Sequence, residues 1–183
     1  LMYSTVKIMQ KSIRRRKKMA TRKVKLSGIA EWAKVFEQNR DHKGYEGAYE
    51  DFDGACTIDL IIDDDNLNLL QASRSMKKGS PDREGRGTKV TFVRKFDTGR
   101  DWDSWPPTVL KSDDTPWNLE ADGLIGNGSK VEVHLAVYDT KRRDIVGTRL
   151  DKIKVLDLVR YVSEASDTIP QPQAVVAEES VLF

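Results

Sequence analysis

Residues 125–138, IGNGSKVEVHLAVY, decide the fold class of this 183-residue chain. A Gly-rich turn opens the stretch. A strictly alternating segment follows, in which valine and leucine take one face and Glu132, His134 and Tyr138 take the other. A polar loop at 139–144 and a return segment rich in lysine and β-branched residues come next. The pattern predicts a β-hairpin of a small barrel, with one apolar face and one polar, partly aromatic face.

Shorter alternating segments predict the other strands, at 55–62, 88–96 and 108–110, with a return strand at 148–161. Within 88–96, Val90, Phe92 and Phe96 share one phase and are expected in the core. Residues 29–38 alternate loosely, as a first strand or a short helix would. We expect one short helix at 67–76, capped by the aspartates before it, with Leu69 and Leu70 facing inward. Five short strands joined by Gly- and Pro-containing loops predict an all-β small barrel.

Charge is unevenly distributed, although the net charge is only +2. Every charged residue from 1 to 25 is basic and every one from 163 to 183 is acidic. We therefore predict a basic N-terminal extension at 1–24, one domain at 25–162, and a flexible acidic tail at 163–183. Since Met19 would make an ordinary start, the residues before it are expected to be upstream translation or a mobile arm, with an Arg-rich transit peptide as the alternative.

The sole cysteine, Cys56, excludes a disulfide framework, and no apolar run is long enough for a membrane helix. These features predict a protein of a reducing, intracellular compartment with no membrane contact. No phosphate-binding loop of the Walker type is present, because the 126–129 turn precedes a strand and lacks the lysine spacing. We predict no enzymatic activity and no cofactor.

Residues 126–133, the Val146–Gly147 pair and the closing segment 153–159 resemble the single-stranded DNA-binding proteins of T-seven-like bacteriophages. The terminal Phe183, which follows Glu178 and Glu179, is another mark of that family. The resemblance implies a five-stranded OB-fold that coats single-stranded DNA during replication, recombination and repair of phage DNA in the cytoplasm of the infected host. It also implies a homodimer and a tail through which the phage DNA polymerase and the helicase/primase are bound.

Binding of single strands without sequence preference requires a cationic path for the phosphates and exposed rings for the bases. Tyr138 is the first stacking candidate, because it lies opposite the apolar face of its strand. Trp102 and Trp105 lie in one loop and are the next candidates. The predicted cations are Arg94, Lys95, Lys130, Lys141, Arg142, Arg143, Arg149, Lys152 and Lys154.

Three other functions are open to this sequence. An RNA-binding OB module and a protein-interaction barrel without a nucleic-acid partner are the first two. The third is a metal-dependent nuclease, since the consecutive Asp63, Asp64 and Asp65 suggest carboxylate ligands for Mg²⁺. Asp63 before a helix is more simply an N-cap, and neighbouring residues of one turn rarely converge on one ion.

Overall fold

A single antiparallel-rich sheet organises the described part of the chain, residues 19–160 of the computed structural model. Its strands follow the order β3-β4-β2-β1-β6-β7-β5. The prediction of a mostly β fold is confirmed. The elements are β1 (Thr21–Lys34), β2 (Ala55–Ile62), α1 (Asp64–Ala72), β3 (Ser80–Pro81), β4 (Thr88–Lys95), β5 (Thr108–Leu110), α2 (Leu119–Asp122), β6 (Ser129–Asp139) and β7 (Val146–Asp157).

Strand β1 begins at Thr21, earlier than the sequence suggested, so residues 21–24 of the predicted extension belong to the sheet. Val24, Leu26 and Ala30 lie on its inner side, and the exposed Lys23, Lys25 and Ser27 lie on the other side. The density of lysine and arginine conceals this alternation in the sequence. The strand is long enough to pair with β6 over its first part and with β2 over its second.

The core lies between the inner faces of the five long strands, where alternating apolar side chains from each strand are excluded from water. Phe92 is fully buried, as predicted, whereas Phe96 is only partly buried. It lies just beyond β4, where the Arg40 guanidinium lies 4.2 Å from its ring centroid. On β6 the valines and Leu135 point inward and Tyr138 points outward, so the prediction of which side chains face the core is confirmed.

Two helices are present among residues 19–160 in addition to short 3-10 turns, where one helix was predicted. Helix α1 starts three residues early because the Asp63 side chain accepts a hydrogen bond of 2.8 Å from the Asn66 amide. Leu70 is buried, but Leu69 is 54% exposed, since consecutive helix residues point about 100° apart. Helix α2 lies where a loop was predicted, and Asn118 caps it.

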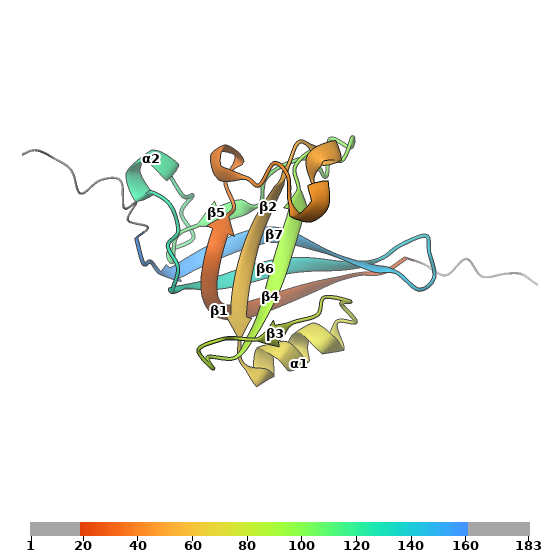
Figure 1. The fold of residues 1–183 in the computed structure, drawn as a ribbon, viewed down its shortest axis with the longest axis horizontal. Helices are drawn as coiled ribbons and strands as arrows, with labels where there is room; N and C mark the ends of the chain where they lie inside the picture. The colour runs from red at the N-terminus through yellow and green to blue at the C-terminus, as the bar shows by residue number, and fades with distance from the viewer. Residues whose placement is uncertain (1–18, 161–183) are drawn as a thin grey trace, which may run out of the picture.

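Strands β4 and β7 are separated in the sheet order but come together in space. The Arg94 guanidinium on β4 donates to the Leu150 carbonyl at 3.4 Å and to the Asp151 carboxylate at 3.1 Å. Beyond this point the β6–β7 hairpin projects away from the body of the sheet, with α1 to one side of it (Figure 1). The sheet therefore curls on itself, and a hollow opens between β4 and the hairpin.

Candidate nucleic-acid interface

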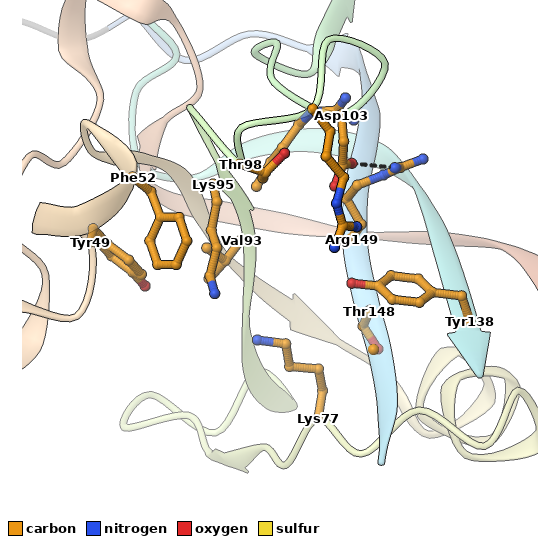
Figure 2. A pocket seen from close by; sticks show the side chains of 13 residues that line it. Tyr49, Phe52, Lys77, Val93, Lys95, Thr98, Asp103, Tyr138, Thr148 and Arg149 are labelled. Carbon is orange, nitrogen blue, oxygen red and sulfur yellow. Dashed lines mark hydrogen bonds and ion pairs between the residues drawn. The ribbon is translucent and has the colours of Figure 1, made fainter. Parts of the chain in front are cut away.

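Two adjoining hollows border the β6–β7 hairpin. One, of about 510 Å³, lies between the hairpin, β4 and the 39–54 loop, and the other, of about 1050 Å³, lies between the hairpin, the 97–107 loop and the start of β1. They share Arg100, Asp103, Tyr138 and Arg149, so they form one continuous depression, here called the groove. Figure 2 shows the smaller of the two hollows. Aromatic and cationic side chains account for most of its functional groups. These are Tyr49, Phe52, Trp102 and Tyr138, and Lys77, Arg94, Lys95, Arg100, Lys141, Arg142 and Arg149.

Tyr138 stands at the junction of the two hollows. Its side chain is 37% exposed on the outer face of β6, and its cross-strand partner on β7 is Gly147. A Cβ atom at position 147 would lie 2.6 Å from the Tyr138 hydroxyl oxygen and closer still to the ring. Glycine at 147 thus lets the ring lie flat across β7 and reach into the groove.

Substituting Gly147→Ala is therefore expected to displace the Tyr138 ring from the groove. We expect a several-fold loss of affinity for oligo-dT, within the range of about 1–3 kcal/mol that one stacked base contributes. Titration followed by tyrosine fluorescence measures it. Gly85→Ala is the control, because nothing lies within 4 Å of a Cβ there, its positive φ strains only that turn, and the turn does not line the groove. An alanine at 147 that binds as well as the parent would show that the ring position is irrelevant.

Phe52 and Tyr49 come from the 39–54 loop, which is fastened to the end of β4. The Asp97 amide donates to the Phe52 carbonyl at 2.8 Å, and the Gly54 amide donates to the Tyr49 carbonyl at 3.0 Å. The Lys95 ammonium lies 4.0 Å from the Phe52 ring centroid. Burial, together with the negative charge of Asp41, raises the pKa of the Tyr49 phenol, so it stays neutral. No role was predicted for this loop from the sequence.

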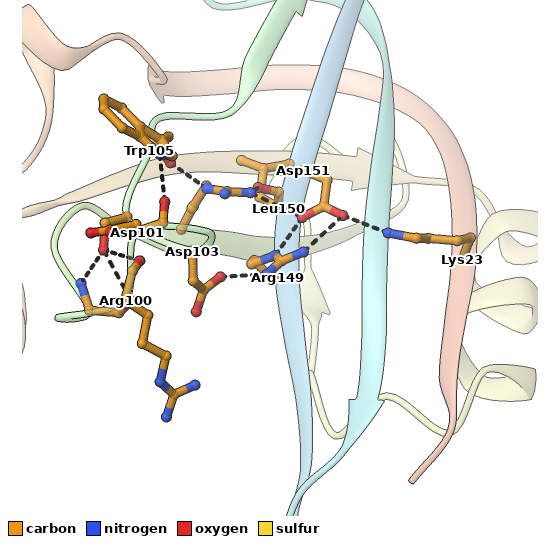
Figure 3. Close-up of polar contacts among 11 residues, drawn as sticks. Lys23, Arg100, Asp101, Asp103, Trp105, Arg149, Leu150 and Asp151 are labelled. Atoms are coloured by element: carbon orange, nitrogen blue, oxygen red, sulfur yellow. Dashed lines mark hydrogen bonds and ion pairs between the residues drawn. The ribbon is translucent and has the colours of Figure 1, made fainter.

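Trp102 lies in the 97–107 loop and is 69% exposed, with the Arg100 guanidinium 5.6 Å from its ring centroid. Trp105 is nearly as exposed, but it does not line the groove; its indole N–H donates to the Asp101 carbonyl at 2.6 Å (Figure 3). The loop is attached to β7 and β4, because Arg149 pairs with Asp103 and the Arg94 Nε donates to the Trp105 carbonyl. Trp102 is thereby placed over the hairpin.

Asp151 is the centre of this support. It accepts hydrogen bonds from Arg94 Nη1 at 3.1 Å, from Arg149 Nε at 2.6 Å and from Lys23 Nζ at 2.9 Å (Figure 3). Burial opposes its ionisation, but the hydrogen bonds from Arg149 and Lys23 prevail and lower its pKa. Burial lowers the pKa of Arg94, and the nearby charge of Arg149 acts in the same direction.

Arg94 therefore has a structural role. It is 9% exposed, and its donors face protein acceptors. Arg94 has the same phase as Val90 and Phe92, which are buried on the same side of β4.

The other predicted cations divide between the groove and its surroundings. Lys95, Lys141, Arg142 and Arg149 line it. Arg143 is at the exposed tip of the hairpin without lining either hollow. Further along the outer face lie Lys130, Lys152, which is opposite His134, and Lys154, which pairs with Asp114 at 3.0 Å. Two groove cations, Lys77 and Arg100, were not predicted, because they lie in loops without periodicity.

The remaining predicted sites concern the tail and a metal. Glu178, Glu179 and Phe183 lie outside the described residues. Among residues 19–160 no three His, Cys, Asp or Glu side chains are grouped as metal ligands, and Asp63 serves as the cap of α1. No helix of this part of the chain is long and apolar enough to cross a membrane.

Comparison with known proteins gives matches among solved structures. No family model and no curated protein matches the chain. It is similar to the crystal structure of the single-stranded DNA-binding protein encoded by bacteriophage T7, with 18% identity and a TM-score of 0.45 over 85% of this chain and 98% of that one. It is also similar to the single-stranded DNA-binding protein of bacteriophage Enc34 in complex with single-stranded DNA, with 12% identity and a TM-score of 0.49 over 74% and 86%. The same Enc34 protein in another structure has 15% identity and a TM-score of 0.46 over 79% and 87%.

Proposed function

We propose that this chain is a single-stranded DNA-binding protein, that its fold is an OB-fold, and that the groove holds the DNA strand. The supporting observation is one continuous groove that is lined by four aromatic side chains together with cations. In an OB-fold assignment of this structure, the five barrel strands are β1, β2, β4, β6 and β7. The loops that border the groove then join strands one and two and strands four and five, which flank the binding face of OB-folds.

The charges of the groove favour a polyanion. Its two lining carboxylates are already engaged, Asp103 by Arg149 and Asp139 by Arg22 at 3.1 Å. Lys77, Lys95, Arg100, Lys141 and Arg142 form no ion pair with any carboxylate in the described part of the chain. A strand passing through would place phosphates near these cations and bases on the rings, which is the combination that sequence-tolerant single-strand binding requires.

Titrations with oligo-dT, oligo-rU and duplex DNA at several salt concentrations test the proposal. We expect oligo-dT to bind more tightly than the other two, with a logarithmic salt slope of about −0.7 for each phosphate neutralised. Preference for oligo-rU would instead indicate an RNA-binding module. Salt-insensitive indifference to all three would indicate a protein-interaction barrel, and either result would overturn the proposal.

The biological setting extends the same proposal. It comprises replication, recombination and repair of phage DNA in the infected host cytoplasm, a homodimer, and contacts of the acidic tail with the DNA polymerase and helicase/primase. The support is the sequence resemblance and the acidic residues that precede Phe183. Pull-down of the polymerase by the full chain, compared with a chain lacking the last six residues, is expected to show loss of the contact.

A further inference from the structure

Two lysines that no ion pair engages meet at one end of the groove. Lys95 comes from the last residue of β4, and Lys77 comes from the connector that follows α1. Figure 2 shows the two side chains extending toward the same space between the strand and the connector. Both line the same hollow, together with Phe52 and Tyr49.

Each lysine is attached to a fixed piece of backbone. The connector that carries Lys77 is joined to β7 through the Ser75 and Thr148 hydroxyls, 2.6 Å apart, and to β1 through Arg22, which donates to the Ser73 carbonyl at 2.6 Å. Lys95 is paired with Ala55 of β2, and its ammonium rests over the Phe52 ring. The two charges are therefore brought together by the fold, not by a chance meeting of mobile side chains.

The arrangement is unfavourable for the protein alone. No carboxylate of residues 19–160 pairs with either ammonium group. By contrast, Lys23, Arg94 and Arg149 all pair with Asp151. Burial lowers the pKa of the Lys77 ammonium, and the charge of Lys95 lowers it further. A bound anion between the two groups would relieve both effects, because it supplies the missing opposite charge.

We propose that Lys77 and Lys95 form a two-lysine clamp for a single backbone phosphate of the bound strand. This inference rests on the proposed function, since it names the subsite of the groove that receives the phosphate. A phosphodiester fits because its two non-bridging oxygens can accept one hydrogen bond from each ammonium. The carboxylates of an acidic segment share this chemistry in part, and the test separates the two.

The test compares the Lys77→Gln, Lys95→Gln and doubly substituted full-length chains in oligo-dT titrations over a range of salt concentrations. Lys78→Gln is the matched control, because Lys78 is the next residue, is exposed and does not line the groove. If one phosphate is shared, the remaining lysine still neutralises it, so each single change is expected to lower the affinity by about tenfold with a slope loss well below 0.7, and the double change is expected to lower the slope by about 0.7 in all. Additive losses in slope would assign the lysines to separate phosphates, and no loss would remove them from the site; either overturns the clamp.

Acetylation of lysines, mapped by mass spectrometry, keeps this inference separate from the proposed function. Oligo-dT and inorganic tripolyphosphate are each expected to protect Lys77 and Lys95 but not Lys78. If oligo-dT binds and leaves both lysines reactive, the clamp is wrong while the proposed function stands. If oligo-dT does not bind, the proposed function fails, and failure of tripolyphosphate to protect the pair then refutes the clamp as an anion site. Equal reactivity of both lysines with and without residues 163–183 would exclude the tail as their occupant.

Discussion

Replacing Tyr138 with alanine is expected to weaken oligo-dT binding by about 5- to 150-fold, the equivalent of the 1–3 kcal/mol that stacking of one base contributes. The ring stands where the two hollows of the groove join, so a strand that uses either hollow passes it. Loss of the ring also exposes the Gly147 backbone, which the ring covers, and widens the groove at this point. Fluorescence anisotropy of a labelled oligo-dT measures the change.

Tyr45→Ala is the matched control for this prediction. Tyr45 is the most exposed tyrosine of the 39–54 loop, at 84%, and it does not line the groove. The two variants should have equal urea midpoints, because neither ring belongs to the core cluster. Equal affinities for the Tyr138 and Tyr45 variants would mean that bases stack elsewhere.

Arg94→Met is expected to destabilise the folded state by about 3 kcal/mol, the lower end of the range for removing one partner of a buried ion pair. The substitution leaves the Trp105 and Leu150 carbonyls without their donor and weakens the contact between β4 and β7. Asp151 keeps Arg149 and Lys23, which limits the loss. Urea denaturation, followed by far-UV circular dichroism, measures the free energy of unfolding.

Arg83→Met serves as the control for Arg94, because Arg83 is exposed in the turn before β4 and a surface change of this kind is usually worth less than about 0.5 kcal/mol. A second consequence concerns the loop that Arg94 supports. We expect faster proteolysis at residues 97–107 in the Arg94 variant than in the control. A stability equal to that of the control would show that the buried guanidinium contributes nothing net.

The sequence predicted the strands of this protein better than its groove. Alternation alone gave β2 and β5 with their observed bounds and the inward phase of β6, because a strand with one buried face must alternate. Arg94 was predicted to be a DNA-binding cation, although it has the same phase as Val90 and Phe92. Its partner Asp151 comes from β7, and only the fold brings the two residues together.

The groove was only partly predictable for a related reason. Tyr138 was found because it lies on a strand of regular phase. Phe52 and Lys77 come from loops whose positions depend on tertiary hydrogen bonds to β4 and β7. Local sequence carries no signal for such contacts. The aromatic content of the 39–54 loop was the one available indication. In an OB-fold the loop between the first two barrel strands borders the binding face, so this loop could have been assigned to it.

Photocrosslinking of the full chain to oligonucleotides that contain 5-iododeoxyuridine, with the attachment sites read by mass spectrometry, tests the groove most directly. The exposed aromatics outside it, Trp32 and Tyr45, provide an internal control within the same molecule. We predict crosslinks at Phe52, Trp102 and Tyr138. Crosslinks confined to Trp32 and Tyr45 would contradict the assignment of the groove as the path of the DNA strand.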